Sequence, residues 1–189
     1  MASSRCLRNQ SRPITNAPYK NIVVRHLPGH PQLGRLTAGA RTFRCALGKS
    51  GVTRTKREGD GATPVGLFLL RRIWYRNDIL RLSGCRLPLK SIQRDDGWCD
   101  EPNDKRYNKS IKRPFSPSHE RMWRPDNVYN IVIEIGWNDA PVIRGKGSAI
   151  FFHLARPGFT PTEGCVAINL EAMRKILPRI GPKTRFDIA

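Results

Sequence analysis

Residues 128–137 read VYNIVIEIGW, and every second residue from Tyr129 onward is large and apolar. The alternating set consists of Tyr129, Ile131, Ile133, Ile135 and Trp137. Because successive side chains of a β-strand point to opposite faces, this alternation predicts a strand with one face in the core. The segment 148–154, SAIFFHL, instead has apolar residues in succession, which predicts a strand buried on both faces.

The rest of the chain adds further strands and a single helix. Runs of β-branched and aromatic residues predict strands at 21–25, 40–47, 66–75, 87–92 and 183–188. The helix is expected over 169–177, where an apolar stripe has helical spacing and consists of Met173, Ile176, Leu177 and Ile180. Asn169 suits its N-cap and Pro178 its end. The expected fold class is mainly β, a mixed β-sheet sandwich with one packed helix.

The length of 189 residues fits one domain with an arm or an insertion. Residues 1–18 are polar and basic and predict a flexible N-terminal arm, which leaves 19–189 as the domain. Residues 93–127 are rich in Pro, Asp, Asn and Arg and predict a long loop, inserted as a lid or binding loop. A disordered insertion is the alternative, but its four aromatic residues favour order: Trp98, Tyr107, Phe115 and Trp123. The glycine-rich segment 49–63 predicts a second loop.

The chain is strongly basic, with a formal net charge of +19 that lies mostly in its first two thirds. Such a field attracts anions, including nucleic acid. No recognised nucleic-acid motif is present, so no dedicated nucleic-acid site is expected, and a solvated basic surface is the simpler interpretation. No apolar run approaches the roughly 18 residues that a membrane-spanning helix needs.

The N-terminus and the cysteines favour a reducing compartment. The first 20 residues have no apolar stretch of the kind that a secretory signal requires, which predicts a cytoplasmic protein. A periplasmic location is the alternative if the true start lies elsewhere. The five cysteines are odd in number and form no Cys-x-x-Cys, so we expect no disulfide framework, no metal site and no cofactor.

The segment 153–169, HLARPGFTPTEGCVAIN, has the residues for nucleophilic chemistry. His153 ends a predicted buried strand, and Cys165 lies in a turn just before the predicted helix. A strand-end imidazole that faces a cysteine supplies a base and a nucleophile. Gly164 lets the backbone approach a substrate, and successive N–H groups near Cys165 suit an oxyanion hole. Taken alone, a packed cysteine and a core histidine remain the alternative.

Three separated motifs favour a catalytic role for Cys165 and His153 over a purely structural one. They are Thr162-x-Gly164-Cys165 preceded by His153, the segment TPVGLF at 63–68, and the segment GSAIFFH at 147–153. In this order they resemble the L,D-transpeptidase catalytic domain, also called YkuD. The resemblance covers roughly residues 22–188 and implies a β-rich fold with cysteine-based acyl transfer.

The resemblance also implies a role for each matching residue. Cys165 would be the nucleophile, His153 would activate it, and the backbone carbonyl of Leu154 would orient the imidazole. The N–H groups of Gly164 and Cys165 would hold the oxyanion. The partner would be a peptidoglycan stem tetrapeptide or muropeptide, attacked at its third residue, typically diaminopimelate, with release of the terminal D-alanine.

The chain departs from the commoner family pattern at three points. Glu163 stands where those proteins have a second histidine, and Ala167 stands where they have an arginine. The separation of His153 and Cys165 is also shorter than usual. We hypothesise that Arg156 replaces the missing arginine as a carboxylate clamp; an ordinary surface arginine is the alternative.

Other residues are weaker candidates. His119, beside Glu120 in the insertion, is a candidate to contact substrate from a lid, although a solvated loop is the simpler interpretation. The acidic pairs at 95–96 and 100–101 are expected to be solvated. The segment 49–57 lacks the pattern of a phosphate-binding loop.

The sequence therefore favours an L,D-transpeptidase-type cysteine acyltransferase that releases D-alanine and transfers the peptide to an amine. An L,D-carboxypeptidase that trims cytoplasmic muropeptides is the alternative within the same chemistry. A non-catalytic basic module that binds anionic glycan or nucleic acid is the alternative from another class, and a redox or metal protein is a weaker third.

Overall fold

A nine-stranded mixed sheet dominates the structure, a computed structural model that describes residues 17–189. The predicted arm at 1–18 therefore lies almost wholly outside the described residues. The strands of this sheet are β1 (Asn21–Leu27), β2 (His30–Ala38), β3 (Arg41–Ala46), β6 (Gly66–Tyr75), β7 (Leu89–Ser91), β11 (Ile131–Ile135), β12 (Phe151–Leu154), β13 (Val166–Ile168) and β14 (Arg185–Ile188). Their order is β11-β12-β13-β3-β2-β1-β14-β6-β7.

The sheet closes on itself because β11 pairs with β6 as well as with β12. An apolar cluster fills its inner side, with Ile22, Leu36, Ile133 and Phe152 among its fully buried members. Burying so many aliphatic and aromatic side chains is the main favourable contribution to folding. The predicted mainly β fold class is confirmed.

The helix α1 (Leu170–Ile176) covers part of this cluster. Its apolar stripe is buried as predicted, and the side chain of Asn169 caps it by accepting a hydrogen bond from the Ala172 N–H at 2.7 Å. The chain then continues through Pro178 as a 3-10 turn at Leu177–Arg179. Pro178 therefore ends the α-helix without ending the helical path, because its missing N–H costs nothing in a turn's first positions.

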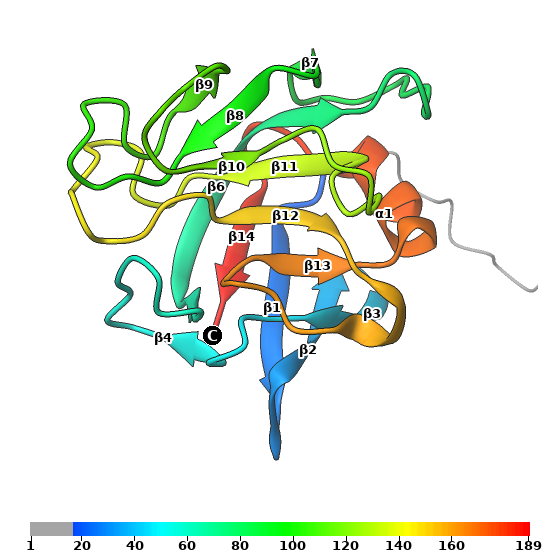
Figure 1. Cartoon of the computed structure of the whole chain (residues 1–189). Helices are drawn as coiled ribbons and strands as arrows, with labels where there is room; N and C mark the ends of the chain where they lie inside the picture. The colour runs from blue at the N-terminus through cyan, green and yellow to red at the C-terminus, as the bar shows by residue number, and fades with distance from the viewer. Residues whose placement is uncertain (1–16) are drawn as a thin grey trace, which may run out of the picture.

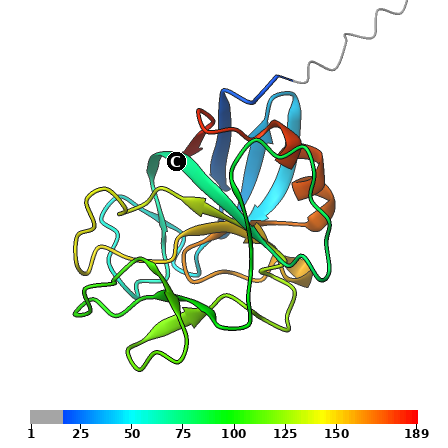
Figure 2. The same cartoon turned by 90° about the horizontal axis from the view of Figure 1, so that it is seen from above.

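A second, smaller sheet covers the outside of β11 and β12 (Figure 1). It consists of β8 (Asp96–Cys99), β9 (Ser110–Lys112) and β10 (His119–Arg121), in the order β10-β8-β9. These strands lie in the segment where we expected a long loop. Figure 2 shows this layer at the opposite end of the molecule from β1, β2 and β3.

A second apolar cluster holds the smaller sheet against the main one. Trp74, Met122, Val132 and Phe151 are among its fully buried members, and Trp98 and Trp123 pack against the cluster. The aromatic residues of the insertion thus have an interior of their own, which explains why the segment is ordered. It also explains why β12 is buried on both faces, as predicted.

The predicted alternation over 128–137 is only partly correct. Ile131, Ile133 and Ile135 share the inner cluster, but Tyr129 lies in a turn before β11 and belongs to the second cluster. All five residues of β11 are buried, because the insertion covers the face that alternation assigns to solvent. Trp137 lies beyond the strand's end.

Two other segments differ from expectation. The strands that we predicted do not include β2, which contains Gly34. A Cβ on Gly34 would meet the Arg25 carbonyl oxygen at 2.8 Å, so this glycine permits close approach inside a strand. The expected loop at 49–63 contains the short paired strands β4 (Val52–Thr53) and β5 (Thr63–Pro64).

Within residues 17–189, no helix is long and apolar enough to cross a membrane. The four cysteines in this range, Cys45, Cys85, Cys99 and Cys165, are free thiols. The same residues contain no group of three or more potential metal ligands. The location of the protein, predicted from the first 20 residues, stays a prediction.

Candidate active site

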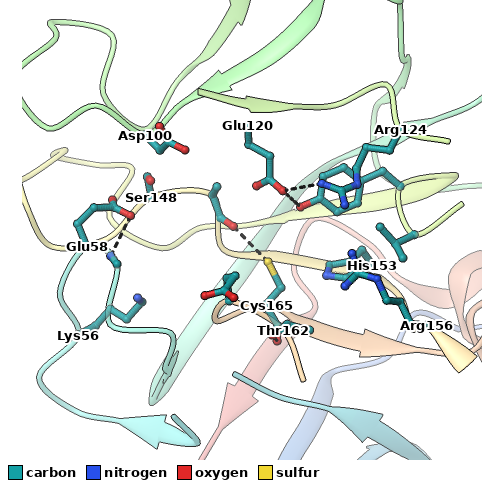
Figure 3. Close-up of a pocket in the computed structure, with 15 residues that line it drawn as sticks. Lys56, Glu58, Asp100, Glu120, Arg124, Ser148, His153, Arg156, Thr162 and Cys165 are labelled. Carbon is teal, nitrogen blue, oxygen red and sulfur yellow. Dashed lines mark hydrogen bonds and ion pairs between the residues drawn. The ribbon is translucent and has the colours of Figure 1, made fainter. Parts of the chain in front are cut away.

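Parallel pairing of β12 with β13 places the predicted base beside the predicted nucleophile. His153 lies in β12 with Ala167 as its register partner, and Cys165 immediately precedes β13. Both side chains line one pocket of about 370 Å³, shown in Figure 3. Cys165 is 7% exposed and His153 is 6% exposed, so access to both is through this pocket.

The Cys165 thiol is held by the backbone that leads into β12. Its Sγ donates a hydrogen bond to the Ala149 carbonyl at 3.2 Å and accepts one from the Phe151 N–H at 3.3 Å. Ala149 has a φ of 50°, which is uncommon for a residue other than glycine. The side-chain oxygen of Asn108 stabilises this conformation by accepting the Ala149 N–H at 3.1 Å. The insertion therefore helps to fix the position of the nucleophile.

His153 is oriented by the next residue's backbone. The Leu154 carbonyl lies 2.9 Å from Nδ1, so Nδ1 carries the proton and donates it. Nε2 is then left as the base. The ring also packs edge-on against Tyr129, with 5.2 Å between the centroids. The predicted orienting carbonyl is thus in place.

Burial keeps both reacting groups uncharged. Desolvation, with smaller effects of the nearby Arg124 and Arg156 charges, lowers the pKa of His153 to about 4. Desolvation, followed by the negative charge of Glu120, raises the pKa of Cys165 to about 12. The resting pair is therefore a neutral thiol and a neutral imidazole, and the thiol must lose its proton as it attacks.

The turn before Cys165 is fixed to the neighbouring loop. The Thr162 N–H bonds to the Leu47 carbonyl at 2.9 Å, and the Thr162 carbonyl accepts the Lys49 N–H at 2.8 Å. Glu163 pairs with Lys49 at 2.6 Å while its side chain stays 77% exposed. Glu163 therefore lies at the rim of the pocket rather than against the thiol.

Within this turn, Gly164 has a conformation that a side chain would not tolerate. Its φ is 131°, and a Cβ there would meet the Ala62 carbonyl oxygen at 2.8 Å. Its N–H, a predicted oxyanion donor, bonds to Thr162 Oγ1 at 3.2 Å. Thr162 Oγ1 in turn donates to the Cys165 carbonyl at 2.6 Å. The Gly164 donor would have to exchange this partner to serve an oxyanion.

The insertion supplies a wall of the pocket that our sequence analysis missed. Glu120 of β10 accepts a hydrogen bond from Tyr129 at 2.7 Å and lies 3.5 Å from Arg124. All three line the pocket, as does Asp100, which we expected to be solvated. Burial raises the pKa of the Glu120 carboxyl. Adjacent residues of a strand face opposite sides, so His119 and Glu120 could not both face the pocket. A strand prediction at this segment would have made Glu120 a candidate in place of His119.

His119, the residue that we proposed in this region, does not line the pocket. Its Nδ1 lies 2.8 Å from the Pro117 carbonyl, and its ring packs against Phe115. Adjacent residues of a strand face opposite sides, so β10 directs Glu120 to the pocket and His119 away from it. The structure therefore does not bring His119 to the pocket, and its predicted contact with substrate stays a prediction.

Arg156 does line the pocket, close to His153. It donates a hydrogen bond from Nη2 to Asp126 at 2.9 Å, and Asp126 also pairs with Arg124 at 2.6 Å. The Arg156 side chain remains 43% exposed. A guanidinium has five N–H donors, and the contact with Asp126 uses only one of them. Ala167, by contrast, is buried in β13 opposite His153.

The remaining wall comes from the segment that follows β4 and from the residues that directly precede β12. Lys56 is buried and pairs with Asp60 at 2.5 Å. Glu58 accepts hydrogen bonds from Tyr107 at 2.5 Å and from the Gly59 N–H at 3.2 Å. Ser148 completes this side. The pocket is thus lined by charged groups of both signs.

A sequence model described as the L,D-transpeptidase catalytic domain (YkuD) matches residues 32–188. This chain belongs to that family. Members of the family act on peptidoglycan peptides, and the match covers the pocket, both strands that form it and the insertion. The resemblance inferred from the three motifs is confirmed.

The crystal structure of L,D-transpeptidase 1 from Mycobacterium tuberculosis is similar to 89% of this chain and 61% of that chain. The sequences are 10% identical, and the TM-score is 0.37. The chain therefore covers less than two thirds of that protein. No curated protein sequence matches this chain significantly.

Proposed function

We propose that this chain is a cysteine L,D-acyltransferase that acts on peptidoglycan stem tetrapeptides through a thioester at Cys165. The observation that supports this most strongly is that Cys165 and an oriented His153 line the same pocket. A nucleophile and a base within one desolvated site are the requirements for covalent acyl transfer.

The neutral pair defines the order of proton transfers. As Sγ attacks the carbonyl at the L-centre of the third residue, its proton passes to His153 Nε2 and the carbonyl oxygen becomes an oxyanion. Collapse breaks the bond to the terminal D-alanine, whose nitrogen takes the proton from Nε2. An acceptor amine or water then attacks the thioester carbonyl and loses a proton to Nε2. The C–S bond breaks, and the leaving Sγ takes that proton from Nε2, which restores the neutral pair.

Arg156 is the proposed clamp for the carboxylate of the leaving D-alanine. It lines the pocket beside His153, on the side where the leaving nitrogen must receive a proton. Its guanidinium keeps unused donors although Asp126 accepts one. A carboxylate that pairs with an arginine by two hydrogen bonds gains both energy and orientation.

The test uses purified protein, a disaccharide-tetrapeptide, and product analysis by mass spectrometry with and without an added D-amino acid. We expect release of D-alanine by the wild-type protein and none by Cys165→Ala. Exchange with the D-amino acid identifies a transpeptidase, and tripeptide alone identifies an L,D-carboxypeptidase. Absence of D-alanine release from folded wild-type protein would contradict the proposal, and retained anion binding would then favour the binding module.

A further inference from the structure

A groove of about 550 Å³ lies beside the catalytic pocket, and the buried side chain of Lys56 lines both. Its walls come from two loops, residues 54–60 after β4 and residues 137–147 after β11. The Glu58 N–H joins the loops by donating a hydrogen bond to the Gly145 carbonyl at 2.8 Å. The groove is therefore held open by contacts of the protein itself, next to the site of the proposed chemistry.

The groove is strongly basic. Four exposed cationic side chains line it, two from each loop: Arg54, Arg57, Arg144 and Lys146. Within residues 17–189, none of these four side chains forms an ion pair, and no carboxylate lines the groove. Lys56 is not a fifth uncompensated charge, because it pairs with Asp60 at 2.5 Å. The positive charge of the four is left without a counter-charge from the protein.

The acidic residues of the two loops have other partners. The loops contain three of them, Glu58, Asp60 and Asp139. Asp139 pairs with Arg71 at 2.6 Å. Glu58 accepts a hydrogen bond from the Tyr107 hydroxyl at 2.5 Å, and Asp60 is held by the lysine described above. Because like charges gathered in one groove repel each other, they attract an anion from outside the protein.

The direction of the acyl donor leads to this groove. His153 gives a proton to the leaving nitrogen, so the terminal D-alanine lies on the His153 side of Cys165. The acyl part of the donor then extends to the other side, where Figure 3 shows Lys56 and Glu58. Two stem residues precede the third one, and two residues of extended chain cover only about 7 Å. The sugar end of the donor therefore leaves the pocket near Lys56 and enters the groove.

Phosphate is the anion that suits several arginines best. A guanidinium is planar and binds two phosphate oxygens through parallel N–H groups. A diphosphate concentrates at least two negative charges in a small volume, whereas a single carboxylate has only one and N-acetylated sugars have none of their own. Ile143 and Trp137 also line the groove and add apolar surface for a sugar ring.

We propose that the groove lined by Arg54, Arg57, Arg144 and Lys146 binds a phosphate or diphosphate at the sugar end of the acyl donor. This inference rests on the proposed function and names its donor class: stem peptides on a phosphorylated sugar, linked to a nucleotide or to a lipid, ahead of peptides on phosphate-free glycan. The phosphate contributes affinity and takes no part in the reaction at Cys165. Because the four cations are exposed, the contribution weakens with salt.

The experiment compares three donors that carry the same tetrapeptide. The first is N-acetylmuramoyl-tetrapeptide without phosphate, the second has uridine diphosphate on the sugar, and the third has a short prenyl diphosphate there. All three have the same stem carboxylates, so the comparison isolates the phosphates. Steady-state release of D-alanine gives kcat and KM for the wild-type protein and for the double variant Arg57→Gln/Arg144→Gln, which removes one charge from each loop. Arg174→Gln is the matched control, because this exposed arginine lies on α1 outside the groove.

We expect the wild-type KM for each diphosphate donor to be about tenfold below that for the phosphate-free donor at low salt, as charge-assisted hydrogen bonds at an exposed site predict. The double variant should reduce this ratio to about threefold or less, and about 0.5 M NaCl should reduce it in the wild-type protein. Arg174→Gln should keep the wild-type ratio. A lower KM for the uridine donor alone would support the groove with a nucleotide-linked donor, and a lower KM for the prenyl donor alone would support it with a lipid-linked one.

Equal KM values for the three donors with the wild-type protein would overturn the proposed groove and leave the proposed function intact. A KM ratio that the folded double variant does not change would also overturn it, since the phosphates would then bind elsewhere. Release of D-alanine from none of the donors would contradict the proposed function, and the donor class falls with it. Circular dichroism of each variant verifies folding.

Discussion

Two walls of the pocket differ in origin. One is built by β12, β13 and the turn between them, and it holds His153 and Cys165. The other is built by the insertion and holds Asp100, Glu120 and Arg124. The first wall contains a neutral reacting pair, whereas the second contains charges and hydrogen-bonding groups.

This difference separates chemistry from recognition. The reacting pair needs low exposure and backbone hydrogen bonds, which the main sheet provides through paired strands. Recognition of a charged peptide needs ionised groups near the reacting carbon, and the insertion brings these from a separate small sheet. The insertion also contributes to the first wall, because Asn108 stabilises Ala149 beside the thiol. The two walls therefore form a single functional unit.

The largest effect is expected from His153→Ala in the first wall. Loss of the base should lower kcat by about 10²–10⁴-fold with the fold retained. His119→Ala is the matched control, since this histidine faces away from the pocket. The rate of D-alanine release from the tetrapeptide is measured for both variants. A normal kcat for His153→Ala would contradict the assignment of His153 as the base.

The pH dependence follows from the pKa of His153, which burial lowers to about 4. The imidazole accepts a proton only when neutral, so activity should persist from neutral pH down to about 5. Below about pH 4, kcat/KM should fall about tenfold per pH unit. The measurement is a pH–rate profile with recovery of activity on return to neutral pH. An inflection near the ordinary histidine value, about 6.5, would contradict the desolvated pair.

A smaller effect is expected from Arg156→Ala. If the guanidinium holds the leaving group's carboxylate, KM should rise about tenfold while kcat changes little. Arg174→Ala on the exposed side of α1 is the control. Steady-state kinetics with the tetrapeptide give both constants, and an unchanged KM would reduce Arg156 to a surface residue paired with Asp126.

The smallest effect concerns the influence of the second wall on the first. Burial and then the Glu120 charge raise the pKa of Cys165, so Glu120→Gln should lower that pKa. Glutamine keeps an oxygen for the Tyr129 hydroxyl. We expect alkylation of Cys165 by iodoacetamide at pH 8 to become a few times faster, since more thiolate is present. The rate is followed by mass spectrometry of the Cys165 peptide, with Glu171→Gln on α1 as control. An unchanged rate would show that the charge of Glu120 does not act on the thiol, and a slower rate would contradict the predicted direction of the pKa shift.

The first wall could be predicted from the sequence and the second could not. The motif residues at 147–153 and 162–165 are local in the chain, and a strand–turn–strand path brings them together. Asp100 and Glu120 reach the pocket only through pairing of β8 with β10. That pairing depends on tryptophans packed against β11 and β12, and single-sequence patterns do not encode such contacts.

The same reason explains the error in the fold. Alternation over 128–137 identified the strand but assigned one face to solvent, because the covering sheet was interpreted as a loop. The helix, in contrast, depends on a local cap and an apolar stripe, and its prediction is confirmed within a residue at each end.

Formation of an acyl-enzyme at Cys165 is the step on which the proposed function depends. The most direct measurement is rapid quenching of wild-type protein with the tetrapeptide, followed by digestion and mass spectrometry of the peptide that contains Cys165. We expect an added tripeptide mass on Cys165 that hydroxylamine removes and that is absent in Cys165→Ala. Release of D-alanine without this adduct, or an adduct on Cys45, Cys85 or Cys99, would contradict it.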